Sequence, residues 1–369
     1  MNPPNKKKTI ALVIDNLARG GAETMLVSLL KPLSENYSII LVTLNSKLDF
    51  SEDEIICDAR LCLNYNSIKE MPWAIMKLKN IINKYKPDLV HCQLFWSTII
   101  GRFSVPKQMP FIFSIHNKLS IDAFQANKLS YFLEKYTYRS RHTIISVSED
   151  AMIDYKKFIN VKGRSIVLNN FVDAKFFTQP YDFTNRSLEE IKIVAVGNLR
   201  HQKNYEFLLN VLNSIKDKIK IQLDIIGEGP LRYNLQSIID KNHLNVNLLG
   251  QKANVELLLP NYDAFIMSSF YEGFGNAPVE AMAVGLPLIL NDLEVMKEMS
   301  KGNALFYESG NEQLLAELLL NLPSKKEELV RMSEQGKLNA KENYSPEHYV
   351  TKLKKIYENL IDESLKTTS

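Results

Sequence analysis

The feature that most constrains the fold of this chain is an alternation of short, continuously apolar runs with helical patterns. In the first half, apolar runs predict strands at 9–14, 38–44, 88–92, 111–115, 143–147 and 165–168, and helical spacing predicts helices at 22–34, 72–84, 95–103 and 121–139. Strands that are apolar on both sides are typical of parallel sheets covered by helices on both faces. The first half therefore predicts a doubly wound α/β domain.

The alternation starts again after residues 174–190, which lack periodicity and therefore mark a domain boundary. Strands are predicted at 191–196, 221–226, 246–249, 263–267 and 287–290, with helices at 205–214, 231–240, 312–320, 325–341 and 346–361. We expect two facing Rossmann-like doubly wound parallel-sheet domains, residues 1–175 and 176–345. Residues 346–369 are expected to form a C-terminal crossover helix that packs back on the first domain, with a frayed tail from Asp362 to Ser369. Ligands of such sheets bind beyond the carboxyl ends of the strands, so a ligand would lie in the cleft between the domains.

Composition excludes several classes of protein. The 369 residues have ordinary hydrophobic and charged fractions, 45% and 24%, and contain no apolar stretch long enough to span a bilayer. The odd number of cysteines argues against a disulfide framework, and Cys57, Cys62 and Cys92 do not have the spacing of metal ligands. No signal peptide is visible, so we expect a cytoplasmic protein.

Positive charge is concentrated in the first half of the chain. Residues 1–175 contain 24 Lys and Arg against 16 Asp and Glu, and the remaining residues contain 21 against 26. This asymmetry predicts an anionic partner for the first half. No basic-aromatic nucleic-acid module is recognisable, so the expected partner is an anionic membrane surface or a phospholipid-like acceptor, and not nucleic acid.

The strongest functional signal is residues 268–283, Ser-Ser-Phe-Tyr-Glu-Gly-Phe-Gly-Asn-Ala-Pro-Val-Glu-Ala-Met-Ala. A predicted strand leads into a glycine-rich turn with Glu272, and a helix then starts near Asn276 and carries Glu280. The unpaired N–H groups at a helix N-terminus favour a phosphate, and two carboxylates can hold sugar hydroxyls. The alternative is structural: Glu280 complements the helix dipole and Glu272 is a solvated loop residue.

Four other segments also follow predicted strands and would share the same edge of their sheets. They are the pair Gly20 and Gly21, the residue His116, the loop 197–204 with Arg200 and Lys203, and the turn 227–229. Each has an ordinary alternative as a turn, a structural histidine or a solvated pair of cations. Their coincidence at equivalent places on the two sheets favours a common site, in which the two cations would bind a diphosphate.

These segments, in this order, resemble the retaining nucleotide-sugar glycosyltransferases of family four. The resemblance spans about residues 8–360 and rests on Gly-Gly-Ala-Glu, His116-Asn117, Gly-x-Leu with Lys203, Ile-Gly-Glu-Gly-Pro-Leu, and a Glu-x7-Glu string from Glu272 to Glu280. It implies the GT-B fold of two facing Rossmann-like domains. It also implies transfer of a sugar from a nucleoside-diphosphate sugar, expected to be a UDP-sugar, to a saccharide acceptor.

The resemblance also implies roles for individual residues. Glu272 would hold hydroxyls of the donor sugar, and Glu280 would hold the ribose hydroxyls of the nucleotide. Lys203 would neutralise the departing diphosphate, and His116 would contact the donor sugar near the reacting centre. The other expected donor contacts are Gly21, Asn198, Gly227, Gly273, Phe274, Gly275 and Asn276.

One position departs from the family pattern. The family often has Arg directly after the glycine of its Gly-Arg-Leu loop, where this chain has Asn198; Arg200 would supply the missing charge. Charge on the leaving group would then be stabilised by Lys203, Arg200 and a helix N-terminus. The family needs no metal between aspartates and no Asp-x-Asp motif is present, so we expect neither a metal nor a cofactor. Retention of configuration is implied by the family alone.

Acceptor contacts are expected from the first domain, where this family varies most. Two segments there combine aromatic and basic residues: 72–84, which includes Trp73 and three lysines, and 131–142, which includes Tyr136, Tyr138, Arg139 and His142. They favour peripheral attachment to the inner face of the cell membrane and a lipid-linked acceptor in surface polysaccharide synthesis. The alternative is ordinary surface helices whose lysines extend along apolar neighbours.

Two other functions stay open at this point. A nucleotide-sugar 2-epimerase or a phosphorylase would use the same two-domain fold, although the Glu-x7-Glu string argues against the epimerase. A non-enzymatic, two-lobed sugar-binding protein is disfavoured by the cations at 200 and 203 and by the lack of a secretion signal.

Overall fold

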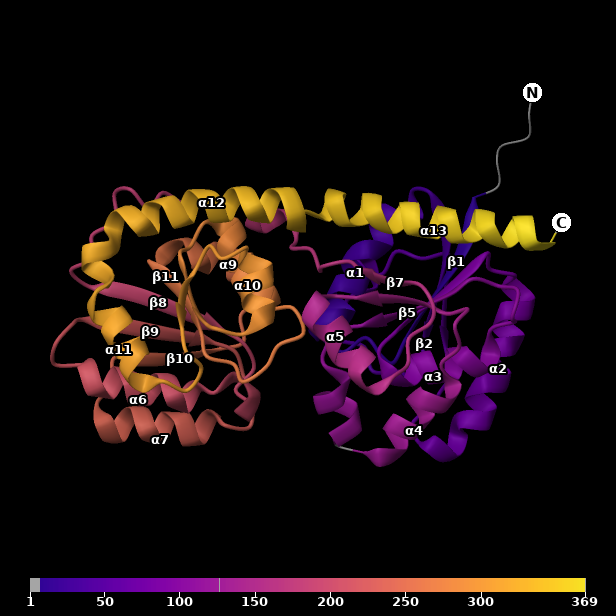
Figure 1. Ribbon diagram of the computed structural model, residues 1–369, viewed down its shortest axis with the longest axis horizontal. Coiled ribbons are helices and arrows are strands. Elements are labelled where there is room, and N and C mark those ends of the chain that lie inside the picture. The colour runs from indigo at the N-terminus through magenta and orange to yellow at the C-terminus, as the bar shows by residue number, and fades with distance from the viewer. Residues whose placement is uncertain (1–6, 126, 369) are drawn as a thin grey trace, which may run out of the picture. The chain divides into compact units, whose positions relative to one another are not determined.

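The computed structural model describes residues 7–125 and 127–368. The chain divides into two compact units (Figure 1). The first unit runs to Asn170 and also includes the chain from Glu347 onward, and the second is Phe171–Pro346.

The first unit is built on a parallel sheet that has seven strands within the described residues, in the order β3-β2-β1-β4-β5-β6-β7. The strands are β1 (Lys8–Ile14), β2 (Tyr37–Thr43), β3 (Ala59–Cys62), β4 (Leu89–Gln93), β5 (Phe111–Ile115), β6 (Thr143–Ser146) and β7 (Ser165–Val167). The order reverses between β1 and β4, which pair directly from Ile10 with Leu89 to Ile14 with Gln93. Such a reversal is where doubly wound sheets bind ligands.

Helices cover both faces of this sheet. They are α1 (Gly21–Ser34), α2 (Met71–Tyr85), α3 (Phe95–Ser104), α4 (Lys128–Thr137), α5 (Glu149–Phe158) and α13 (Pro346–Thr368), with a π-helical segment at Ser120–Gln125. One core cluster joins α2, α3 and α5 to the sheet through residues such as Leu78, Ile100 and Tyr155. The last helix, α13, belongs to this unit through Tyr357, whose ring contacts Tyr37 and His91.

The second unit repeats the plan with a parallel sheet of six strands in the described chain, in the order β10-β9-β8-β11-β12-β13. The strands are β8 (Ile191–Val196), β9 (Ile221–Ile226), β10 (Val246–Gly250), β11 (Ala264–Met267), β12 (Leu288–Asn291) and β13 (Leu305–Tyr307). Here the order reverses between β8 and β11. The loops that follow these two strands therefore flank the expected ligand position of this unit.

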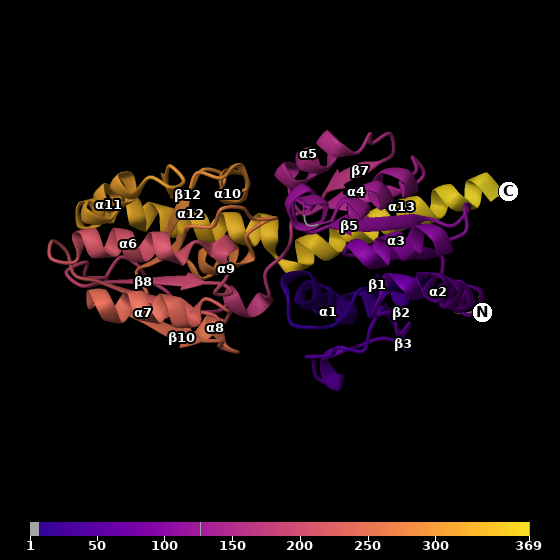
Figure 2. The same cartoon turned by 90° about the horizontal axis from the view of Figure 1, so that it is seen from below.

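The helices of the second unit are α6 (Tyr205–Ile215), α7 (Arg232–Asn242), α8 (Val255–Leu258), α9 (Asn276–Val284), α10 (Glu294–Ser300), α11 (Glu312–Leu320) and α12 (Lys326–Tyr344). Figure 1 shows α6 and α7 on one face of the sheet and α9 and α10 on the other, where α9 packs against α12. Figure 2 shows α7 beside β10 at one edge of the sheet.

The structure confirms the predicted fold class of two parallel-sheet α/β domains with a helical C-terminal extension. Sequence periodicity missed the short elements β3, α5, α8, α10 and β13. It missed α5 although Ser148 caps it, with its Oγ accepting a hydrogen bond from Ala151 N at 3.1 Å. The apolar residues of this helix are divided between a buried and an exposed side, since Ile153 and Phe158 are exposed, and this obscures the helical spacing. The single helix predicted at 121–139 is wrong, since the π-helical segment ends at Gln125 and α4 begins at Lys128.

The predicted frayed tail is also wrong for the residues that the structure describes. Helix α13 continues through Thr368, and Ser369 lies outside the described residues. Ion pairs from Asp362 to Lys8 at 3.1 Å and from Glu363 to Arg164 at 2.9 Å join this last part of the helix to the first unit. Among the described helices, none has a stretch both long and apolar enough to cross a bilayer.

Candidate active site

In the second unit, the two loops at the reversal of strand order are held together by hydrogen bonds. The loop after β8 meets the segment after β11 where Phe270 N donates to Gln202 O and Gln202 Nε2 donates to Tyr271 O, both at 2.9 Å. Ser268 Oγ donates to Lys203 O at 2.9 Å. The sequence segments 197–204 and 268–275, far apart in the chain, therefore form one rigid edge.

At this edge Lys203 and Glu272 form an ion pair. Lys203 Nζ lies 2.5 Å from Glu272 Oε1, and the two side chains are only 17% and 10% exposed. Both residues were expected to contact the donor, one at the diphosphate and one at the sugar. The structure brings these two side chains into direct contact.

The turn after β9 packs against the same loop through glycines. A Cβ on Gly227 would lie 2.1 Å from Gly197 O, and one on Gly229 would lie 2.5 Å from Leu199 O. Leu199 N also donates to Glu228 O at 3.0 Å. No side chain larger than hydrogen fits at these two positions, so Gly227 acts here by allowing close backbone packing.

Helix α9 starts at the carboxyl edge of this sheet, directly after Gly275. Gly275 has φ +95°, in the left-handed region that favours glycine, and it occupies the N-cap position before Asn276. Gly273 and Phe274 are buried, and the Phe274 ring packs edge-on against Tyr344 at 5.4 Å. The first N–H groups of α9 therefore begin within this glycine turn, where a helix N-terminus attracts anions.

Glu280 lies one turn further along α9 and is partly buried. Burial raises its pKa to about 7; Lys175 opposes this shift, and the carboxylates of Glu256 and Asp173 add to it. Lys175 Nζ also lies 3.4 Å from Glu256 Oε2. This group of charges was missed from sequence because Lys175 and Glu256 lie far from Glu280 along the chain.

Asn198 stands at the position of the family arginine, and Arg200 is the residue expected to supply the missing charge. Asn198 and Arg200 are both exposed, and Arg200 occupies the N-cap position of the short 3₁₀ helix His201–Lys203. Substitution of Arg200 for the family arginine stays a prediction.

In the first unit, a cavity of about 220 Å³ lies at the reversal of strand order. Its lining comes from the ends of three strands and from the π-helical segment: Asp15 after β1, Leu94 after β4, His116 after β5, and Asp122 and Ala123. Phe95, Phe113 and Leu119 supply apolar surface. A cavity with carboxylates, a histidine and apolar walls suits one sugar ring better than a charged group. Gly21, the other predicted residue of this unit, is the first residue of α1.

His116 ends a chain of buried hydrogen bonds in this cavity. Its Nε2 lies 2.6 Å from Gln93 Oε1, Gln93 Nε2 lies 3.0 Å from His91 Nε2, and His91 Nδ1 lies 2.7 Å from Tyr357 OH. Burial lowers the pKa of His116 to about 4, so the ring is neutral at pH 7. With Nε2 donating to the glutamine carbonyl, Nδ1 is an acceptor, and it is buried without a partner among the described residues. A hydroxyl group of a ligand would satisfy it.

Asp15 is a further candidate residue that sequence analysis left in a loop. Burial raises its pKa to about 6, against hydrogen bonds from Ser97, whose N donates to Asp15 Oδ1 at 2.7 Å. Beside it, Leu94 has φ +72°, which is unusual for a branched side chain and marks a constrained position. The sequence signal for Asp15 is its position directly after the predicted strand 9–14.

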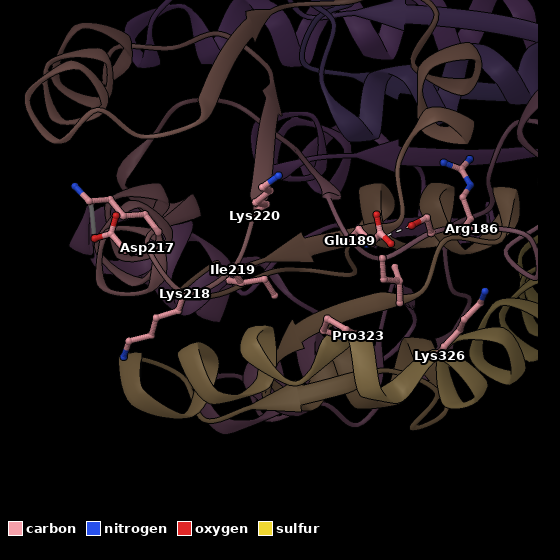
Figure 3. Close-up of a pocket in the computed structure, with 11 residues that line it drawn as sticks. Arg186, Glu189, Asp217, Lys218, Ile219, Lys220, Pro323 and Lys326 are labelled. Carbon is pink, nitrogen blue, oxygen red and sulfur yellow. Dashed lines mark hydrogen bonds between the residues drawn. The ribbon is translucent and has the colours of Figure 1, made fainter.

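A larger pocket lies away from all predicted site residues. It has a volume of about 690 Å³ and is lined by Pro323 and Lys326, near the start of α12, and by residues that precede β8 and β9, including Arg186, Glu189, Lys218 and Lys220 (Figure 3). These residues lie at the amino ends of the strands, the edge opposite to ligand sites in such sheets. Within the described chain, no three His, Cys, Asp or Glu side chains gather as metal ligands would.

Comparison with known proteins supports a two-domain glycosyltransferase. A sequence model described as "Glycosyl transferases group 1" matches residues 181–339, and one described as "Glycosyltransferase Family 4" matches residues 19–176. The chain belongs to the family-4 type of glycosyltransferases with the GT-B fold.

Relatives of this chain include glycosyltransferases named for a lipid-linked saccharide and for capsular polysaccharide. It is 23% identical over 342 residues to a Campylobacter jejuni alpha-1,4-N-acetyl-D-galactosaminyltransferase whose name includes a PP-undecaprenol-linked saccharide; the match covers 88% of this chain and 92% of the relative. It is also 23% identical to the capsular polysaccharide biosynthesis glycosyltransferase CapH of Staphylococcus aureus, over 81% of this chain and 85% of CapH.

A solved structure shares the fold over nearly the whole chain. Anabaena Alr3699/HepE, determined in complex with UDP, has a TM-score of 0.79 at 17% sequence identity and covers 95% of this chain and 100% of its own. The epimerase, phosphorylase and sugar-binding alternatives are not favoured by these relatives. The roles of individual residues and the location between the domains stay predictions.

Proposed function

We propose that this enzyme transfers a sugar from a UDP-sugar to a lipid-linked saccharide in surface polysaccharide synthesis, with retention of configuration and without a metal. The observation that carries the donor part is the pairing of Lys203 with Glu272 at the reversal of the second sheet, beside the N-terminus of α9. A cation and a helix N-terminus there would stabilise the charge that develops on a departing diphosphate. The undecaprenol-linked and capsular relatives, and the UDP complex, support the acceptor and the nucleotide.

The experiment that tests this proposal is a transfer assay with a panel of UDP-sugars and lipid-linked saccharides, measuring released UDP and the anomeric configuration of the product. Lys203→Ala should lower turnover by about a hundredfold or more, because it removes one preorganised electrostatic group. Addition of a chelator should leave the rate unchanged. Lys220→Ala is the matched control, since Lys220 pairs with Glu190 on the exposed, opposite edge of the sheet. Near-normal turnover in Lys203→Ala would mean that the donor site is misassigned.

We also propose that the first unit attaches to an anionic membrane through an aromatic–basic surface formed by α4 and α5. Phe132 and Tyr136 on α4 are 49% and 65% exposed and stack on each other, and Ile153 and Phe158 on α5 are also exposed. The same two helices carry four exposed lysines: Lys128, Lys135, Lys156 and Lys157. Apolar groups ringed by cations bind anionic lipid surfaces.

The predicted membrane segment 131–142 is wrong at its C-terminal end. Tyr138 and His142 are buried and form an edge-on ring contact at 5.9 Å, so neither faces a membrane. Helix α4 itself ends at Thr137. The proposed surface is therefore formed by α4 and α5 and excludes the 138–142 segment.

A further inference from the structure

The most informative feature beyond the proposed function is that two residues expected to bind different parts of the donor are bonded to each other. Among the described residues, Lys203 is the only hydrogen-bond partner of the Glu272 carboxylate. The backbone of Lys203 is fixed, because its carbonyl accepts from Ser268 Oγ and its N–H donates to Arg200 O at 3.0 Å. Only the side chains are therefore free to exchange partners.

The Glu272 carboxylate and an incoming diphosphate compete for the ammonium group of Lys203. A diphosphate that approaches Lys203 must replace the Glu272 carboxylate as the partner of the ammonium group. Until it does, the carboxylate also repels the diphosphate at short range, in a largely buried place where such interactions are weakly screened. Glu272 therefore opposes the binding of a nucleoside diphosphate.

We propose that the Lys203–Glu272 ion pair is the resting state of the site. Binding of the donor breaks this ion pair, and its re-formation after transfer releases the nucleoside diphosphate. The donor's diphosphate takes Lys203, and the freed Glu272 accepts hydrogen bonds from the sugar hydroxyls, so the sugar compensates for the broken pair. After transfer, the sugar no longer holds Glu272. The carboxylate then returns to Lys203 and displaces the nucleoside diphosphate. This inference rests on the proposed function of the site.

The test compares the dissociation constants of UDP and UDP-glucose, measured by calorimetry, in the wild type and in Glu272→Gln. The variant should bind UDP about fivefold or more tighter, the lower end of usual couplings between two bound groups. The sugar of UDP-glucose should increase affinity over that of UDP in the wild type, and this difference between the two ligands should be smaller in the variant. Glu190→Gln is the matched control, because it makes the same change in the exposed pair with Lys220 and should alter neither affinity.

The outcomes separate this inference from the proposed function. If the wild type binds UDP and Glu272→Gln binds it equally well or more weakly, the competition does not exist. If the wild type binds neither UDP nor any other nucleoside diphosphate in a panel, the proposed function itself is overturned. If thermal unfolding shows that Glu272→Gln is not folded, Glu272→Ala, which removes the same charge, takes its place in the same comparison of dissociation constants.

Discussion

At the residue scale, the two carboxylates of the proposed donor site, Glu272 and Glu280, have different electrostatic surroundings. Lys203 and Glu272 neutralise each other, whereas Glu280 is desolvated by burial, with one cation, Lys175, and the like charges of Glu256 and Asp173 nearby. A carboxyl group in such surroundings holds its proton to an unusually high pH. The ionisation of Glu280 should therefore be linked to nucleotide binding near neutrality.

We predict that the affinity for a UDP-sugar rises between pH 6 and pH 8. The pKa of Glu280 is raised from 4.5 to about 7. The ionised carboxylate accepts hydrogen bonds from the two ribose hydroxyls more strongly than the protonated acid does, because both of its oxygens are charged acceptors. A ligand that favours the ionised form releases a proton on binding, so calorimetry in buffers of different ionisation enthalpy measures the effect. The diphosphate of a UDP-sugar does not titrate in this range. In Glu280→Gln the pH dependence should disappear; if it persists there, another group is responsible.

The residues of the proposed donor site lie in local sequence patterns, and those that line the cavity of the first unit do not. Lys203, Glu272 and Glu280 stand in recognisable local strings, and the contact between the first two is the one that the structure adds. Asp15 directly follows β1 and Gln93 ends β4, and these two strands are neighbours only because the strand order reverses there. No local pattern encodes that adjacency. The hydrogen-bond chain from Tyr357 to His116 is equally non-local, because it joins α13 to β4 and to the end of β5.

At the element scale, close backbone contacts between turns add to the side-chain hydrogen bonds that hold the loops of the second sheet. The turn at Gly227 lies against Gly197, and the turn at Gly229 lies against Leu199. These contacts fix the loop that carries Lys203. The geometry of the donor site therefore depends on residues that would not touch the donor through a side chain.

We predict that Gly227→Ala lowers donor binding and stability together. Its Cβ would lie 2.1 Å from Gly197 O, so the loop must shift, at a cost of about 1–3 kcal/mol, which is typical of overpacking. Denaturant unfolding and UDP titration measure the two effects. Gly302→Ala is the matched control for a glycine with positive φ, since a Cβ there meets nothing within 4 Å. Equal stability and affinity in Gly227→Ala and the wild type would show that the close packing is unimportant.

Elements also explain why some boundaries escaped prediction. The elements β3 and α8 have four residues each, too few for periodicity to be recognised. The strands β6, β11 and β12 are equally short but fully buried, whereas β3 contains Arg60 and no buried residue. The break between the π-helical segment and α4 is marked by Asn127, whose side chain caps α4 by accepting from Leu129 N at 2.9 Å. The apolar spacing on the two sides of this break is compatible with one helix, which is why the sequence predicted one.

At the scale of the whole molecule, the end of the chain completes the first unit. Helix α13 follows the second unit in sequence, yet its Tyr357 is fully buried against β-strand residues of the first unit and bonds to His91. The first unit therefore lacks part of its core until the whole chain has been synthesised.

We predict that Tyr357→Ala destabilises the first unit by about 3–5 kcal/mol, the usual effect of removing a large buried aromatic side chain. Unfolding followed by hydrogen exchange, which resolves the two units, should show the loss in the first unit and leave the second unchanged. Tyr233→Ala is the control, because Tyr233 is 84% exposed. A loss of similar size in both units would contradict the assignment of α13 to the first unit alone.

Membrane attachment is also a property of the whole protein. We predict salt-sensitive co-sedimentation with vesicles containing phosphatidylglycerol and little with neutral vesicles, because the lysines of the α4–α5 surface require anionic lipid. Replacing both Phe132 and Tyr136 by Ser should weaken sedimentation several-fold, whereas Tyr233→Ser should not. Absence of salt-sensitive binding by the wild type would leave a soluble acceptor.

The measurement that tests the central claim most directly is the crystal structure of this protein with UDP. The claim predicts density for the diphosphate beside Lys203 and the first turn of α9, and for the ribose beside Glu280, with Glu272 separated from Lys203. Nucleotide bound elsewhere, such as in the pocket near Arg186 and Lys220, with the Lys203–Glu272 pair intact, would contradict it.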